Sequence, residues 1–163
     1  MVDKETRQIV YNALIKKGAE FRKGLGVSGR MANFLDNNPN RIEVAFSILL
    51  SMPGIPIIYY GDEIGMRYVE NLVSVEGGYG RTGSRSPMQW DDSTNAGFST
   101  APNQMLYIKQ DQTADRPTAK AQIEDKNSLY NEIKKLISIR KAHKALLSKG
   151  EIEFVYAEKN SYP

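Results

Sequence analysis

Two adjacent carboxylates, Asp62 and Glu63, stand just after the longest apolar run of the chain and are its first candidates for chemistry. A pair of carboxyl groups roughly 5 Å apart across a sugar can cleave a glycosidic bond with retention of configuration. Because adjacent residues at a strand end point to opposite sides, these two cannot flank one glycosidic bond together. Asp62 is therefore interpreted as structural: it would either cap the next turn or pair with a basic residue such as Arg85. For Glu63 a binding role and a structural role both stay open.

Arg85, Gln89 and Trp90 are close together in the chain and carry groups that sugar recognition uses. They offer a planar guanidinium fork, an amide and a flat apolar face for a pyranose ring. Trp90 could instead pin the surrounding loop to the rest of the fold, and this alternative stays open.

Metal and cofactor chemistry is not expected from this sequence. The chain has no cysteine, so neither a disulfide framework nor a thiolate zinc site can form. The single histidine, His143, lies late in a predicted helix, where its cation would complement the helix dipole. The glycine-rich stretch at 77–83 lacks the Lys-Ser/Thr ending of a phosphate-binding loop and opens no helix. We predict no metal and no cofactor.

The composition is that of an ordinary globular chain of 163 residues, with 40% hydrophobic and 25% charged residues. Its net charge of +3 comes from 22 basic and 19 acidic residues that are interspersed, which argues against nucleic-acid binding. Serine, proline and glycine interrupt the apolar run at 45–60, which falls short of the ~20 residues of a membrane helix, so no membrane partner is expected. No apolar segment follows Met1, which argues against a signal peptide and favours a cytoplasmic location.

Apolar residues at helical spacing predict three helices in the first third of the chain. The first is expected over 4–21 and a short second one over 28–35. Pro39 suits the first turn of a third helix, which Pro53 stops.

The second half of the chain is expected to hold a long loop followed by one long helix. Residues 65–125 show no sustained periodicity, and a loop of that length fits a large enzyme better than a small domain. The helix is expected over 128–146, capped by Asn127 or Ser128 and ended by Gly150.

Two strands are predicted, and each lacks a partner in the sequence. Residues 55–60 are apolar on both faces, which favours a buried parallel strand, yet no second strand of this kind occurs. Residues 151–157 alternate in the manner of an antiparallel sheet, and no neighbour follows them. A self-contained fold should not leave both strands unpaired, so the pattern indicates part of a larger domain.

Two long motifs explain the unpaired strands. Residues 52–66 (MPGIPIIYYGDEIGM) closely resemble the segment around the eighth barrel strand of the alpha-amylase superfamily. Residues 84–91 (SRSPMQWD), followed by 95–99 (NAGFS), resemble a stretch typical of its alpha-glucosidases, oligo-1,6-glucosidases and trehalose synthases. The helix at 128–146 resembles the last barrel helix, and the chain from Glu151 onward resembles the first strand of the C-terminal antiparallel domain.

The resemblance, which covers about 40–157, implies an α/β fold class. Residues 1–149 would form the C-terminal part of a (β/α)8 barrel, around its eighth strand and last helix and including the long loop at about 65–125. Residues 150–163 would begin a truncated C-terminal antiparallel β domain.

The resemblance also implies that the catalytic carboxylates lie outside this chain. Family members resemble one another in an aspartate nucleophile, a glutamate acid/base and a further aspartate, at the ends of strands four, five and seven. Asp36 in the sequence NFLDNN is not the last of these, because no histidine precedes it and a helix follows.

The C-terminal end of a barrel strand faces the active site, so the end of the 55–60 strand should line a sugar pocket. The intact protein is expected to bind an alpha-glucoside or a maltooligosaccharide as an alpha-glucosidase-like hydrolase. Alternatives are a trehalose synthase-like glucosyltransferase, a noncatalytic carbohydrate-binding or self-associating module, and a basic interaction protein, which rests on charge alone. The expected substrate-binding residues are Tyr60, Glu63, Arg85, Gln89 and Trp90.

Overall fold

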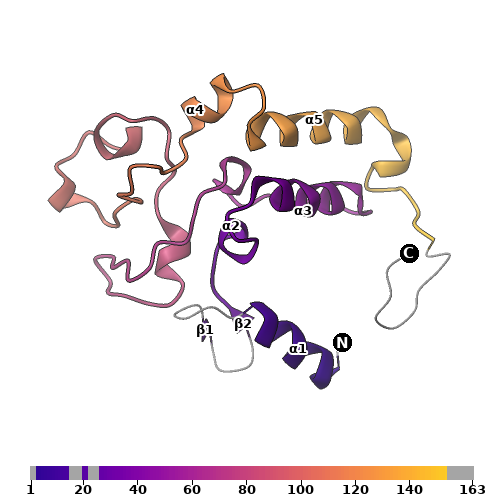
Figure 1. Cartoon of the computed structure of the whole chain (residues 1–163), viewed down its shortest axis with the longest axis horizontal. Coiled ribbons are helices and arrows are strands. Elements are labelled where there is room, and N and C mark those ends of the chain that lie inside the picture. Colours follow the sequence, from indigo (N-terminus) through magenta and orange to yellow (C-terminus); the bar gives the residue numbers. More distant parts are fainter. Residues whose placement is uncertain (1–2, 15–19, 22–25, 154–163) are drawn as a thin grey trace.

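The computed structural model describes residues 3–14, 20–21 and 26–153. Helices dominate the ordered elements, and a long irregular segment separates the first three helices from the last two (Figure 1). The helices and strands in chain order are α1 (Lys4–Leu14), β1 (Glu20–Phe21), β2 (Gly26–Val27), α2 (Met31–Phe34), α3 (Pro39–Ser51), α4 (Ala119–Glu124) and α5 (Leu129–Ala142).

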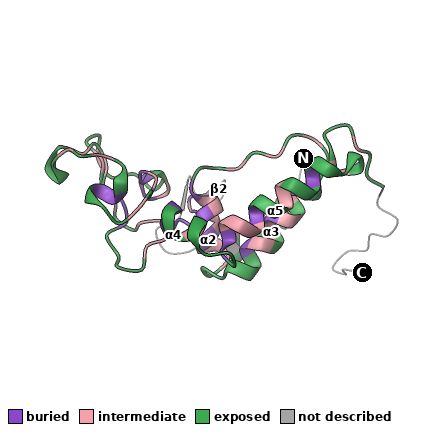
Figure 2. Ribbon diagram, turned by 90° about the horizontal axis from the view of Figure 1, so that it is seen from above, coloured by how far each residue is buried: buried purple, intermediate pink, exposed green. Residues whose placement is uncertain are grey.

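The core lies where α3 and α5 run side by side, with α2 against α3 (Figure 1). Phe46 of α3 and Ile133 of α5 are fully buried in it, and Figure 2 shows buried residues along both helices. Both helices begin at side-chain caps that satisfy free backbone N–H groups: Asn38 accepts from the start of α3, and Ser128 accepts from Asn131 of α5. The predicted third and fourth helices and the Ser128 cap are thus confirmed, but α5 ends at Ala142, short of the predicted end at 146, and Gly150 does not end it.

Arg140 joins the C-terminal ends of α3 and α5. Its Nη1 donates to the carbonyl oxygens of Leu50 and Met52 at 2.6 and 2.9 Å, and its Nη2 donates to that of Gly54 at 2.7 Å. One buried guanidinium therefore satisfies carbonyls at the C-terminal end of α3, which have no partner within that helix.

The first predicted helix is too long. The α1 helix ends at Leu14, and Phe21 belongs to β1, where it faces Gly26 of the antiparallel β2. Residues 15–19 lie outside the described part of the chain. The short second helix is also smaller than predicted and holds only Met31–Phe34.

The strand predicted at 55–60 is not formed in the described chain, because a strand needs a hydrogen-bonded neighbour and none is present there. The segment lies extended with its two faces in different surroundings. Ile58 packs against the core of α3 and α5, whereas Ile55 and Ile57 are 84% and 82% exposed. One of the two apolar faces is covered and the other is open. Of the second predicted strand, residues 151–153 form no regular structure and 154–157 lie outside the described residues.

Residues 65–125 are largely irregular, as predicted, but they are ordered by short helical turns and by α4. The turns are η2 (Thr82–Arg85), η3 (Thr94–Gly97) and η4 (Asn103–Met105). The short helix α4 was not predicted; its N-cap, Thr118, accepts from Ala121 N. Across the part of the chain that the structure describes, no helix has the length and apolarity to cross a membrane.

Candidate functional site

The site begins with a tight turn at the end of the extended 55–60 segment. Gly61 and Gly65 bracket the 3-10 turn η1 (Asp62–Ile64) in left-handed conformations, with φ of 83° and 75°. A Cβ on Gly61 would lie 2.2 Å from the Met66 sulfur, so only glycine fits this position. The turn therefore fixes the directions of Asp62 and Glu63 relative to Tyr60.

Arg30 holds this turn in place through its guanidinium group. Its side chain is buried, and its Nη1 donates to the Tyr60 carbonyl oxygen and, at 3.2 Å, to Asp62 Oδ1. Its guanidinium carbon also lies 4.7 and 4.8 Å from the ring centres of Tyr59 and Tyr60, within cation–π range. Sequence reasoning missed Arg30, because an isolated arginine ahead of a helix carries no signal of a contact thirty residues away.

Asp62 has a structural environment. It pairs with Arg30, not with the Arg85 suggested from the sequence. Burial raises the pKa of the Asp62 carboxyl, and the charge and hydrogen bond of Arg30 oppose that rise. This supports the structural interpretation of Asp62.

Tyr60 connects the end of the extended 55–60 segment to the loop that follows. Its hydroxyl donates to the Ser86 carbonyl oxygen at 2.9 Å. Burial raises the pKa of Tyr60 to about 12, with Tyr59 adding to the rise, while the positive charges of Arg30 and Arg85 oppose it. Arg85 therefore acts on Tyr60 electrostatically although its own side chain is exposed.

This pKa predicts a loss of stability at alkaline pH. Below pH 10 the Tyr60 hydroxyl is protonated in both the folded and the unfolded chain; between pH 10 and 12 it ionises in the unfolded chain first. The free energy of unfolding should therefore fall as the pH rises through that range. In Tyr60→Phe the fall should be smaller, which urea unfolding at several pH values would measure. An equal fall in both proteins would contradict the assignment.

Tyr60 and Glu63 share a cavity of about 560 Å³ between the end of the extended 55–60 segment and α5, here called the strand-end cavity. Ile58, Tyr130 and Lys134 also line it. Glu63 Oε2 is buried without a hydrogen-bond partner among the described residues. The lining thus combines apolar side chains with the Glu63 carboxylate and with hydroxyl groups, a combination that suits a polyhydroxylated ligand.

Gln89 and Trp90 do not line the strand-end cavity. Gln89 is 1% exposed; its side-chain nitrogen donates to the Pro117 carbonyl oxygen, while its Oε1 has no partner among the described residues. Trp90 is fixed through its backbone, which accepts from Lys120 N and donates to the Ala96 carbonyl oxygen. The residue is 52% exposed. The backbone is anchored and the ring is presented to solvent.

A strained turn supports Trp90. Asn95 and Ala96 both adopt left-handed conformations, with φ of 52° and 55°, and such residues cluster at functional sites. The Asn95 side-chain nitrogen donates to the Ser99 and Ala101 carbonyl oxygens at 2.8 and 2.7 Å, which holds the turn closed.

Within the described residues no group of three His, Cys, Asp or Glu side chains could hold a metal ion.

Comparison with known proteins identifies the family. The alpha-amylase catalytic-domain model matches residues 27–150. Trehalose synthase/amylase TreS of Mycobacterium tuberculosis is 38% identical over 149 residues, which cover 89% of this chain and 24% of that protein. The oligo-1,6-glucosidase of Parageobacillus thermoglucosidasius is 34% identical, with 69% of this chain and 25% of that protein covered. The chain thus spans about a quarter of the length of these relatives.

Solved structures of other proteins share the fold of this chain. The trehalulose synthase MutB from Pseudomonas mesoacidophila MX-45 superimposes with a TM-score of 0.63 at 24% identity, covering 74% of this chain and 27% of that enzyme. The isomaltulose synthase of Erwinia rhapontici NX5 gives a TM-score of 0.62 over the same shares. The chain belongs to the alpha-amylase family and is a fragment of its TIM-barrel catalytic domain.

Proposed function

We propose that residues 1–149 are the C-terminal part of the catalytic barrel, with 55–60 as the eighth strand and α5 as the last helix. The order of the motifs and the packing of Ile58 on the α3 and α5 core support this placement. Residues 150–163 would then begin a C-terminal antiparallel β domain. The open face of the 55–60 segment is where neighbouring strands of the barrel would pack.

In the intact protein this fragment would form one wall of the active site of an alpha-glucosidase-like glycoside hydrolase. The observation that carries the proposal is the turn from Tyr60 to Glu63, which Arg30 fixes at the carboxyl end of the strand segment. Barrel enzymes build their active sites at that end. The nucleophile and the acid/base would come from other strands, and the substrate would be an alpha-glucoside or a maltooligosaccharide.

Five residues are proposed to serve substrate binding in the intact enzyme. Tyr60 and Glu63 would present a hydroxyl and a carboxylate oxygen, and Arg85 would bring a positive charge to the same strand end. Trp90 would offer its exposed ring as a platform for a sugar face. Gln89, which is 1% exposed, would serve binding indirectly, by holding the loop that carries Trp90 through its hydrogen bond to the Pro117 carbonyl oxygen.

A trehalose synthase-like glucosyl transfer is the second candidate, favoured by the 38% identity to a protein named trehalose synthase/amylase. Both activities would proceed through the same glycosyl-enzyme chemistry and differ in whether water or a sugar hydroxyl accepts the glucosyl group. To separate them, this chain would replace the matching segment of the Mycobacterium enzyme and, in parallel, of the oligo-1,6-glucosidase. Chromatography of the products from maltose would then measure glucose and trehalose.

Glucose as the main product of both chimeras would support the hydrolase, whereas trehalose from both would support glucosyl transfer. Folded chimeras that bind no maltose would contradict both enzymatic roles. That result would favour a noncatalytic module.

The chain on its own is expected to show no glycosidase activity above background on maltose, isomaltose or a p-nitrophenyl glucoside. Without the nucleophile and the acid/base, neither covalent nor acid–base catalysis is possible. Release of p-nitrophenol, followed by absorbance, is the measurement. Turnover that disappears in Glu63→Gln would overturn the proposal that the catalytic carboxylates lie elsewhere.

A further inference from the structure

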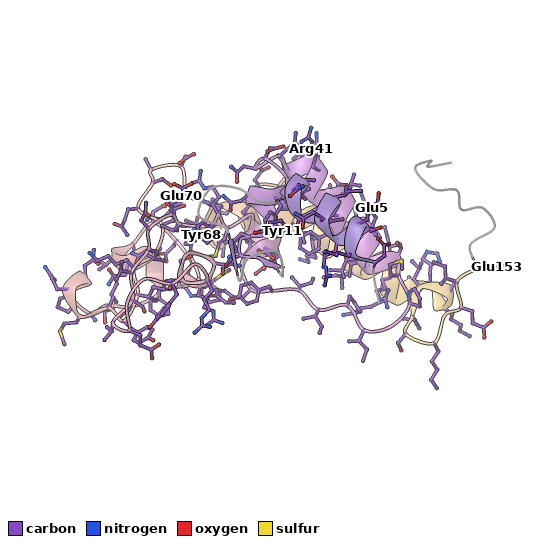
Figure 3. All side chains as sticks on the ribbon, turned by 90° about the horizontal axis from the view of Figure 1, so that it is seen from below. Glu5, Tyr11, Arg41, Tyr68, Glu70 and Glu153 are labelled. Carbon is purple, nitrogen blue, oxygen red and sulfur yellow. The ribbon has the colours of Figure 1, made fainter. Side chains whose placement is uncertain are left out.

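A second cavity, of about 570 Å³, lies inside the long loop and takes no part in the strand-end site. It is here called the loop cavity. Tyr68, Glu70, Asn71, Val73 and Tyr79 are the side chains that characterise its lining. Tyr68 and Glu70 belong to the loop at the end of the molecule opposite Glu153 (Figure 3).

Hydrogen bonds fix the walls of the loop cavity on both sides. Val69 N donates to the Gly83 carbonyl oxygen at 3.0 Å, and the Tyr68 hydroxyl donates to that of Gly80 at 2.8 Å. At the other end Ser74 and Gly77 exchange backbone hydrogen bonds at 3.1 and 2.9 Å. A cavity whose walls are held in place before a ligand arrives loses less conformational entropy on binding.

The charges around the loop cavity favour a neutral ligand. The Glu70 carboxylate in its lining would repel an anion. The Arg81 guanidinium lies 5.6 Å from the centre of the Tyr79 ring and would repel a cation that approached this ring. A ligand with hydroxyl groups and one apolar face avoids both penalties.

The side chains match such a ligand. A carboxylate and an amide, from Glu70 and Asn71, accept and donate hydrogen bonds to hydroxyl groups. Tyr79 is 55% exposed, and the face of its ring that Arg81 does not cover offers a surface for the C–H face of a pyranose. The volume falls in the range of small-molecule sites, about 300–1,000 Å³.

We propose that the loop cavity is a second carbohydrate-binding site, which takes a neutral sugar ring of a di- or oligosaccharide. The inference rests on the proposed action on carbohydrates and adds a binding site apart from the strand end. The chain connects the two regions: from the cavity wall at Gly80 it runs to Ser86, whose carbonyl oxygen accepts from Tyr60. A sugar in the loop cavity would therefore be bound next to the segment that contacts the strand end.

Hydrogen–deuterium exchange with mass spectrometry tests the proposal on the whole chain, and it does so whatever the oligomeric state. Maltose, titrated up to about 50 mM to reach weak binding, should slow exchange in peptides covering 68–80. In Tyr79→Ala the maltose concentration that gives half of this protection should rise at least about tenfold. Glu70→Gln, which keeps the size of the side chain, should raise it by a smaller factor.

Phe98→Ala is the matched control, because Phe98 is an aromatic residue of the same long loop, is 49% exposed and does not line the loop cavity. Its maltose response should equal that of the wild type. Protection confined to 57–66 and 85–98 would overturn the loop site while leaving the proposed function intact. An absence of protection at 68–80, or protection by choline or inorganic phosphate at lower concentrations than maltose, would also overturn it.

Discussion

Arg140→Ala is expected to lower the free energy of unfolding by roughly 3 kcal/mol, because the variant leaves three carbonyl groups without their charged donor. The three acceptors come from Leu50, Met52 and Gly54, where α3 ends and the 55–60 segment begins. Arg140 is nearly buried, so water cannot fully replace it. Urea unfolding followed by circular dichroism would measure the loss.

Two further variants distinguish how much the planar guanidinium geometry and the positive charge of Arg140 each contribute to the free energy of unfolding. Arg140→Lys keeps the charge but cannot reach three carbonyls with one ammonium group, so it should recover only part of the lost stability. Lys141→Ala removes a neighbouring exposed cation and should change stability by less than about 0.5 kcal/mol. If Arg140→Ala unfolded at the same urea concentration as the wild type, the guanidinium would not be what joins α3 to α5.

The core helices could be predicted because their signals are local. The apolar stripe that includes Ile42 and Phe46 repeats at helical spacing within one segment, and Ser128 stands directly before the helix that it caps. The same reasoning placed Tyr60 and Glu63 at a turn after an extended run. Their shared cavity follows from that turn and from α5.

The parts of the fold and of the site that could not be predicted depend on contacts between residues that are distant in sequence. Arg30 meets Tyr60 and Asp62 about thirty residues later, and Gln89 meets Pro117 across a similar gap. No spacing rule predicts such pairs, because the intervening loop sets which residues meet. The motif around Gln89 indicated a sugar-binding amide, whereas the described structure uses its nitrogen to hold the loop and leaves only its Oε1 free.

The open face of the 55–60 segment should control how the isolated chain associates. One side of this segment carries three exposed apolar or aromatic side chains, those of Ile55, Ile57 and Tyr59. The backbone between them has no strand neighbour in the described chain. An unpaired edge with apolar side chains tends to pair with another chain. We therefore expect the isolated chain to form oligomers in which this face is covered.

Ile57→Lys is expected to raise the dissociation constant of these oligomers at least about tenfold, because pairing would bury the new ammonium group against apolar side chains. Analytical ultracentrifugation over a range of concentrations would measure the change. Met105→Lys is the matched control: Met105 is 75% exposed, close to the 82% of Ile57, but lies in η4 away from the unpaired segment. A wild-type chain that stays monomeric, or an equal effect of both substitutions, would show that this face does not drive association.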